Sequence, residues 1–185
     1  MFAAIFPPPE VREVLVGVAE RLGRHATNVK WVEKQNMHLT LRFFGDLTDG
    51  DVKKAEHCLK QVAGVEQPFK AGFLNVGAFP SPSRARVIWV GVEEGKETLI
   101  RTAGELEQSF VRAGLGKGDK PFSPHLTIGR VRVPARTPEL EEAIRSLTLE
   151  RCEFIIEALT LTKSELTPRG PVYSPLSVAK LGAAE

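Results

Sequence analysis

The chain has 185 residues, of which 42% are hydrophobic and 26% are charged. These values are ordinary for a water-soluble globular protein, and the length suits one domain with a substantial core. The formal net charge of +2 at pH 7 argues against a polycation that binds nucleic acid through bulk charge, so any such contact should be local.

The N-terminal segment and the lack of a long apolar run predict a cytoplasmic location. Residues 1–6 are apolar, but they lack a basic leader and run into three prolines, so they predict a first strand rather than a signal peptide. No apolar run approaches the ~18 residues that span a bilayer. Cys58 and Cys152 have neither metal-ligand spacing nor a disulfide framework, and we expect two buried free thiols.

The first half of the chain is predicted to alternate strands and helices. Apolar residues at helical spacing predict a helix over 11–22 and a second over 48–62, which should begin at Thr48, a residue type that caps helix N-termini. The expected strands of this half cover 2–6, 29–33, 36–44 and 69–76.

The second half of the chain is also predicted to alternate strands and helices. Its expected strands cover 86–92, 153–161 and 172–181, together with a strand that begins at His125, and its expected helices cover 96–113 and 138–146. No linker is long enough to separate independent domains. We therefore predict a single α+β domain over 1–185, with helices packed outside two sheets that meet at a groove.

One four-residue phrase occurs twice, nearly half the chain apart: His38-Leu39-Thr40-Leu41 and His125-Leu126-Thr127-Ile128. Side chains alternate between the two faces of a strand, so each phrase presents an imidazole and a hydroxyl on one face and two aliphatic side chains on the other. A single copy is a weak signal. Two copies in the same register predict a duplicated fold with one catalytic strand in each half.

Two imidazoles and two hydroxyls suit acid–base chemistry on a phosphate. A neutral imidazole can take a proton from a nucleophile while a protonated imidazole gives one to a leaving oxygen. Thr40 and Thr127 could donate hydrogen bonds to phosphate oxygens, and Arg130 is either a further donor or a solvated arginine at a strand end. This chemistry requires no metal and no cofactor.

The remaining candidate residues give weaker functional signals. His25 is expected at a helix end and His57 on a solvent-facing helix side, so neither is expected to be catalytic. Trp31 and Phe122 could stack on a base or pack in the core, and we favour the core for Trp31. Five basic residues could meet an RNA backbone if they line the groove, or could simply be solvated: Lys117, Lys120, Arg130, Arg132 and Arg136.

The flanks of the two motifs resemble those of the two-histidine (2H) phosphoesterases, and within them the RNA 2′,3′-cyclic phosphodiesterases, also called 2′-5′ RNA ligases. The resemblance extends over nearly the whole chain. It rests on these segments: Trp31-Val32, Asn36 to Leu41, Phe44-Gly45, Phe79 to Pro82, Arg86 to Gly91, Pro124 to Arg130, Ser164 to Leu166 and Gly170 to Tyr173.

The resemblance implies a bilobal, duplicated α+β fold with two antiparallel sheets around a central cleft. It implies hydrolysis of a terminal 2′,3′-cyclic phosphate of RNA to a 2′-phosphate. His38 would protonate the departing 3′ oxygen, His125 would activate water, and Thr40 and Thr127 would bind the phosphate. RNA ends would be the partner, and we expect a monomer. Two alternatives remain open, a 2′-5′ RNA ligase that acts mainly in the joining direction and a non-catalytic RNA- or nucleotide-binding protein.

Overall fold

The computed structural model describes residues 1–119, 121–133, 137–149, 152–168 and 170–183. Within these ranges the chain forms nine strands, four α-helices and two short 3-10 helices. The helices are α1 (Pro9–Gly23), η1 (Lys34–Asn36), α2 (Asp49–Val65), η2 (Pro82–Arg84), α3 (Lys96–Arg112) and α4 (Pro138–Ser146). The strands are β1 (Phe2–Ile5), β2 (Val29–Trp31), β3 (Leu39–Phe43), β4 (Phe69–Phe79), β5 (Val87–Glu94), β6 (His125–Val131), β7 (Cys152–Ile156), β8 (Ala158–Thr167) and β9 (Gly170–Lys180).

The α+β class and most of the predicted elements are confirmed. The side chain of Thr48 accepts a hydrogen bond from the Asp51 amide at the start of α2, as expected of a cap. One predicted strand is wrong. The segment 153–161 forms parts of two strands, because β7 pairs with β4 whereas β8 pairs with β1, and the chain passes from one partner to the other at Glu157.

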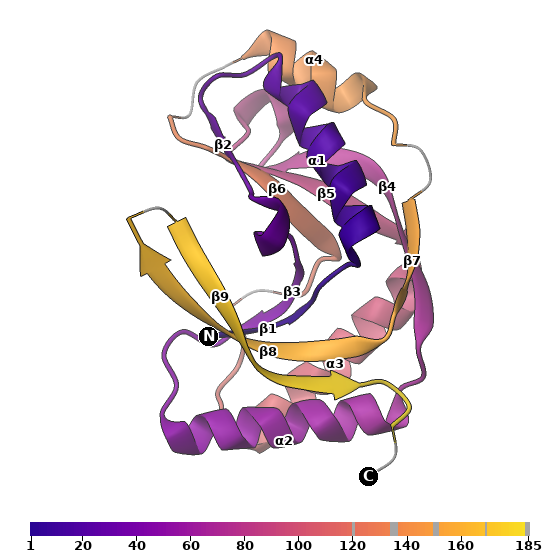
Figure 1. Ribbon diagram of the computed structural model, residues 1–185, viewed down its shortest axis with the longest axis vertical. Helices are drawn as coiled ribbons and strands as arrows, with labels where there is room; N and C mark the ends of the chain where they lie inside the picture. The colour runs from indigo at the N-terminus through magenta and orange to yellow at the C-terminus, as the bar shows by residue number, and fades with distance from the viewer. Residues whose placement is uncertain (120, 134–136, 150–151, 169, 184–185) are drawn as a thin grey trace.

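The described strands form one sheet in the order β7-β4-β5-β6-β3-β1-β8-β9, with β2 also paired to β6. We call β9-β8-β1-β3 the first half-sheet and β7-β4-β5-β6-β2 the second. The pairing of Leu39 with Leu126 joins them. The two separate sheets that the resemblance implies are therefore one curled sheet here, because β3 and β6 stay hydrogen-bonded where the halves meet (Figure 1).

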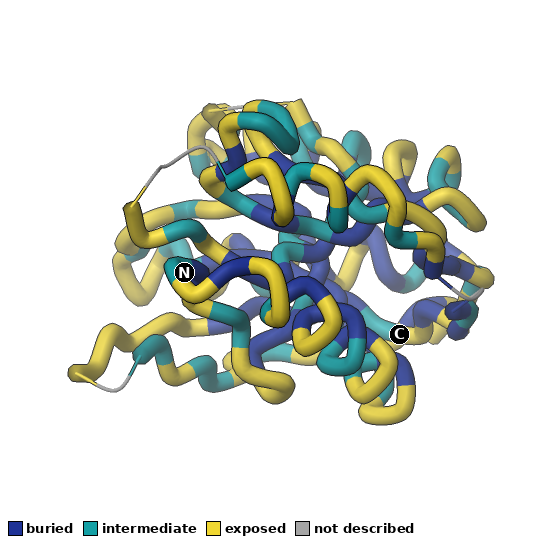
Figure 2. The backbone as a smooth tube through the Cα atoms, turned by 90° about the horizontal axis from the view of Figure 1, so that it is seen from above, coloured by how far each residue is buried: buried dark blue, intermediate teal, exposed yellow. Residues whose placement is uncertain are grey.

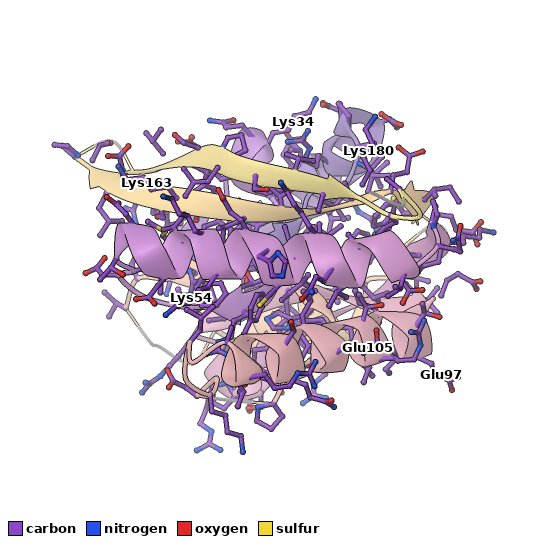
Figure 3. All side chains as sticks on the ribbon, turned by 90° about the horizontal axis from the view of Figure 1, so that it is seen from below. Lys34, Lys54, Glu97, Glu105, Lys163 and Lys180 are labelled. Atoms are coloured by element: carbon purple, nitrogen blue, oxygen red, sulfur yellow. The ribbon has the colours of Figure 1, made fainter. Side chains whose placement is uncertain are left out.

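Each half-sheet is covered by a pair of helices. Helix α2 packs against β8 and β9, and α3 lies beside α2 and contacts β3. Helix α1 contacts β6 and β7, and α4 contacts β4. Figure 1 shows these two helix pairs at opposite ends of the molecule. Figure 3 shows α2 and α3 side by side, with charged residues such as Lys54 and Glu97 on their outer surfaces.

The core lies between the sheet and these helices. Its buried side chains include Leu39 and Leu126 at the junction of the half-sheets, Leu59 of α2 and Phe110 of α3. The buried stretches run through the strands and the inner sides of the helices (Figure 2). Cys58 and Cys152 are buried free thiols, as predicted. None of the described helices has both the length and the apolar character needed to cross a bilayer.

Candidate active site

The two sequence motifs meet at the junction of the half-sheets. Leu39 and Leu126 are directly paired across antiparallel strands and both are fully buried on the helix-covered face. Their neighbours in each strand must point to the opposite face. His38, Thr40, His125 and Thr127 therefore surround the junction on one face of the sheet, which we call the histidine face. All four side chains are partly exposed there.

A β-bulge lies at the last residue of each motif. In β3, Thr40 pairs with Ala4 but Arg42 pairs with Ala3, which leaves Leu41 without a partner. In β6, Thr127 pairs with Trp89 but Gly129 pairs with Ile88, which leaves Ile128 without one. An extra residue reverses the alternation of side chains beyond it.

The bulge in β6 brings Arg130 onto the histidine face. Strict alternation from Thr127 would point Arg130 into the core, three residues further along. Instead Arg130 pairs with Val87, which lies on the same side of β5 as Trp89. The equivalent position after the bulge in β3 is Phe43, which is 65% exposed and lies 5.9 Å from Phe2, ring centre to ring centre.

Both histidine rings are held in the same way. The Nδ1 atom of His38 lies 2.7 Å from the carbonyl oxygen of Asn36, and the Nδ1 atom of His125 lies 2.7 Å from that of Ser123. A carbonyl oxygen only accepts, so each Nδ1 carries the hydrogen and each neutral ring keeps its lone pair on Nε2. The two Nε2 atoms are therefore the groups available for proton transfer.

Aromatic side chains enclose both imidazoles. Phe2 stacks on His38 at 4.7 Å between ring centres, and the Tyr173 ring meets His38 edge-on at 5.2 Å. Phe79 meets His125 edge-on at 5.0 Å, and Trp89 lies 6.2 Å away. These rings exclude water from the imidazoles, which disfavours their charged forms.

Burial lowers the pKa of both His38 and His125 below the ordinary histidine value. The hydrogen bonds that the rings donate to the backbone carbonyls oppose this shift, and the positive charge of Arg130 adds to it at both rings. Burial raises the pKa of Tyr173, and the positive charge of Arg130 partly offsets this rise. One guanidinium thus acts on all three groups, and a bound anion would offset its effect by favouring the imidazolium.

Asn36 and Tyr173 are functional candidates that the sequence reasoning quoted only as parts of the resemblance. The Asn36 carbonyl holds His38, while its side-chain amide donates to the Pro171 carbonyl of β9 at 3.1 Å. Tyr173, two residues further along β9, then meets His38. Because these contacts join segments far apart in the chain, no local pattern could reveal them.

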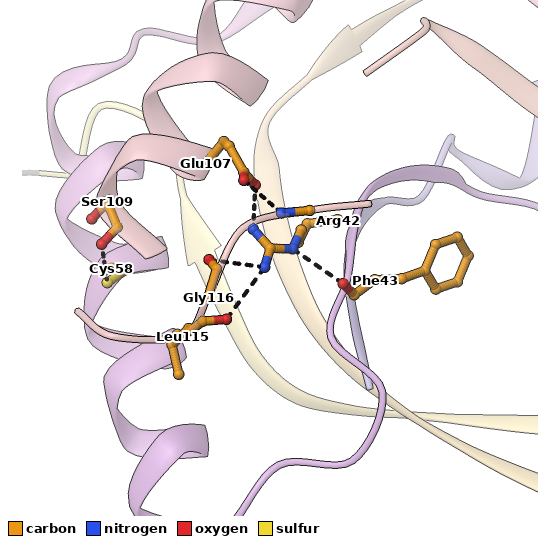
Figure 4. A network of polar contacts seen from close by, with 8 residues as sticks. Arg42, Phe43, Cys58, Glu107, Ser109, Leu115 and Gly116 are labelled. Carbon is orange, nitrogen blue, oxygen red and sulfur yellow. Dashed lines mark hydrogen bonds and ion pairs between the residues drawn. The ribbon is translucent and has the colours of Figure 1, made fainter. Parts of the chain in front are cut away.

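A partly buried ion pair links the strand of the first motif to the loop before the second motif (Figure 4). Arg42 points to the helix side of β3 and pairs with Glu107 of α3. Its guanidinium also donates to the carbonyls of Leu115 and Gly116, at 3.3 and 3.1 Å. Glu107 in turn accepts from the Gly118 amide at 2.8 Å. The network fixes the start of the segment that leads into His125.

The other residues that the sequence analysis singled out lie outside this site. Trp31 packs against the core beneath α1, as predicted, and Phe122 also packs against the core. His25 and His57 are exposed, the first just after α1 and the second on α2. Lys117 and Arg132 are exposed in loops, whereas Lys120 and Arg136 lie outside the described residues.

The described part of the chain offers no metal site, and a pocket that it forms lies away from the motif histidines. No group of three His, Cys, Asp or Glu side chains there could hold a metal ion. A pocket of about 470 Å³ lies between β4, η2 and α4, and its lining includes Leu74, Pro82 and Ile144 but neither motif histidine.

The curled antiparallel sheet and the paired His-x-Thr strands define a two-histidine phosphoesterase. The family model described as the 2′-5′ RNA ligase superfamily matches residues 7–168. The chain belongs to this superfamily.

Curated relatives and solved structures agree with this assignment. A protein of Methanothermobacter thermautotrophicus named RNA 2′,3′-cyclic phosphodiesterase is 33% identical over 97% of each chain. One of Archaeoglobus fulgidus with the same name is 36% identical over 96% of this chain and 98% of its own. The crystal structure of the Thermus thermophilus protein TT0787 superimposes with a TM-score of 0.81 at 30% identity, covering 100% of this chain and 98% of that one.

A further solved structure has the same fold at lower sequence identity. E. coli LigT, complexed with 3′-AMP, superimposes with a TM-score of 0.77 at 23% identity, covering 98% of this chain and 97% of that chain.

Proposed function

We propose that this protein is an RNA 2′,3′-cyclic phosphodiesterase that opens a terminal 2′,3′-cyclic phosphate to a 2′-phosphomonoester. The observation that supports it best is the Leu39–Leu126 pair, which gathers two imidazoles and two hydroxyls on one face. A binding protein would need neither two imidazoles nor two matching Nδ1 hydrogen bonds. The relatives named RNA 2′,3′-cyclic phosphodiesterase support the choice of substrate.

The proposed reaction is an in-line displacement at phosphorus. The Nε2 atom of His125 takes a proton from water as the water oxygen forms a bond to phosphorus. The bond from phosphorus to O3′ breaks, and the Nε2 atom of protonated His38 gives its proton to O3′. The phosphate stays on O2′. The geometry supports a pair of acid–base groups, and the family resemblance decides which ring is the acid.

The remaining residues of the histidine face would stabilise the phosphate. Thr40 and Thr127 each stand two residues beyond a histidine on the same side of a strand, so their hydroxyls can donate to non-bridging oxygens. Arg130 supplies a positive charge that acts on both rings. Charge builds up on the non-bridging oxygens as water attacks, and a fixed guanidinium stabilises that charge.

A short RNA with a 2′,3′-cyclic end tests this proposal. The products are resolved by phosphorus NMR after incubation with the protein and, as controls, with His38→Ala and His125→Ala. We expect a 2′-phosphomonoester from the unchanged protein only. A 3′-phosphate as the main product would contradict the assigned roles, and no turnover of any cyclic end would contradict the proposed function.

A further inference from the structure

We propose that Lys30 binds a second phosphate, the one that joins the terminal nucleotide of the RNA to its neighbour. This subsite would make the protein prefer an oligonucleotide end to a cyclic mononucleotide. The inference rests on the proposed function, because it assumes that the reacting phosphate lies between His38 and His125.

The first observation is the position of Lys30 on the sheet. Lys30 of β2 pairs directly with Arg130 of β6. Directly opposed residues of antiparallel strands point to the same face, with Cβ atoms about 5 Å apart. Because Arg130 lies on the histidine face, Lys30 lies there too. Its neighbour Trp31 points the other way and packs beneath α1.

The second observation is that these two cations have no counter-charge among the described residues. Neither Lys30 nor Arg130 forms an ion pair with any residue that the structure describes. Of the acids at η1, Glu33 accepts from Gln35 and Glu13 pairs with Lys34. Like charges directly opposite each other on a sheet are unfavourable. A polyanion bound across both would remove that cost.

The third observation places the Lys30 head group at the β8–β9 hairpin. Its Nζ atom lies 3.8 Å from the position that a Cβ atom would occupy on Gly170. The same end of β9 is held to η1 by the hydrogen bond from Asn36 to Pro171. Lys30 thus lies beside the start of β9, the strand that carries Tyr173 to His38.

The chemistry of an RNA end matches this row of groups. The cyclic phosphate would occupy the histidines, the threonines and Arg130. The internucleotide phosphate would then reach Lys30, the cation that pairs with Arg130 on the same face. A cyclic mononucleotide has no such phosphate, so Lys30 can discriminate between the two substrates without contacting the reacting atoms.

The test compares two substrates that differ in this phosphate, adenosine 2′,3′-cyclic phosphate and the dinucleotide ApA with a 2′,3′-cyclic end. Lys30→Gln should raise the ratio of the dinucleotide KM to the mononucleotide KM by about three- to tenfold at low salt, with little change in kcat. The salt slope of log(kcat/KM) for the dinucleotide should fall by about 0.7, the value for one lost single-strand phosphate contact. Lys30→Arg should restore both quantities.

Lys34→Gln is the matched control, because Lys34 is a nearby lysine whose charge already pairs with Glu13. It should leave the KM ratio and the salt slope unchanged. Equal effects of Lys30→Gln on both substrates, or no effect on either, would overturn the proposed subsite.

A binding measurement separates this inference from the proposed function. Calorimetry with 3′-AMP and with ApA 3′-phosphate requires no turnover. Lys30→Gln should weaken binding of the dinucleotide alone. A protein that hydrolyses neither cyclic substrate but shows this difference would refute the proposed function and keep the subsite. A protein that hydrolyses both substrates but shows no difference in binding would keep the proposed function and refute the subsite.

Discussion

Leu39 of β3 and Leu126 of β6 form the residue pair that joins the two half-sheets, and both side chains are fully buried. Each leucine stands between the histidine and the threonine of its own motif. Their burial on one face therefore places the polar residues of both motifs together on the other. The apolar half of each motif assembles the site, and the polar half carries the proposed chemistry.

The two imidazoles should be individually necessary. His38→Ala or His125→Ala should each lower kcat by about two to four orders of magnitude, the usual contribution of a positioned acid or base. The double variant should lose much less than the product of the two effects, because the rings act as a unit. Single-turnover kinetics on the cyclic RNA end measures this. A rate near the unchanged protein's in either single variant would contradict the two-histidine mechanism.

The pH dependence should lie on the acid side of the ordinary histidine range. Turnover needs one neutral and one protonated imidazole, which gives a bell-shaped profile. Because the pKa of both rings is lowered by burial and by Arg130, the maximum of kcat/KM should fall below pH ~6.5. A maximum well above that pH would contradict the burial described for the free protein.

Arg130→Gln should move the histidine titrations in a defined direction. The guanidinium disfavours each imidazolium, so its removal should raise the pKa of His38 and of His125. The pH maximum should shift upward while the maximal rate falls, because the charge that we propose to bind the phosphate is also lost. Histidine-detected NMR titration gives both pKa values, and Arg132→Gln in a nearby loop is the control. Unchanged titrations would place Arg130 away from the rings.

The ring of Tyr173 should contribute to activity by covering His38. The ring covers one edge of His38. Tyr173→Leu should therefore raise the pKa of His38 by admitting water and lower kcat by about ten- to a hundredfold through misplacement of the imidazole. Tyr173→Phe keeps the ring and should stay within about threefold of the unchanged protein. Equal losses in both variants would instead assign the main role to the hydroxyl.

The reaction should proceed without a metal ion. In the proposed mechanism the Nε2 atoms must be free to exchange protons, and the described residues offer no group of metal ligands. Extensive treatment with a chelator should leave the rate of cyclic phosphate hydrolysis unchanged. Loss of activity that returned with one divalent ion would show that the phosphate is activated in another way.

The Arg42 network should matter for stability. Arg42 is 8% exposed, and its loss would remove the positive charge that pairs with Glu107 and the donor to the carbonyls of Leu115 and Gly116. Arg42→Ala should lower the free energy of unfolding by about 2 kcal/mol, less than for a fully buried pair because Glu107 is partly exposed. Arg145→Ala removes an exposed pair and should cost under about 1 kcal/mol. Urea denaturation measures both.

Local patterns in the sequence determined the strand faces and the positions of the helices. The alternation of polar and apolar residues in each motif predicted which side chains of a strand share a face, since that depends only on strand geometry. Helical spacing and the Thr48 cap located the helices, because capping and burial of one helix face are also local effects. The family resemblance supplied the proposed substrate and the proposed acid and base roles.

Only the tertiary structure decided which strands pair, and this set the composition of the site. Nothing in 153–161 shows that its two halves pair with different strands. The bulges that bring Arg130 and Phe43 onto the histidine face are defined by the register with β5 and β1, so they cannot be read from β6 or β3 alone. Asn36 and Tyr173 meet at His38 through contacts between segments far apart in the chain, and Lys30 joins Arg130 in the same way. Strand geometry is a local property, whereas register is a property of two strands at once.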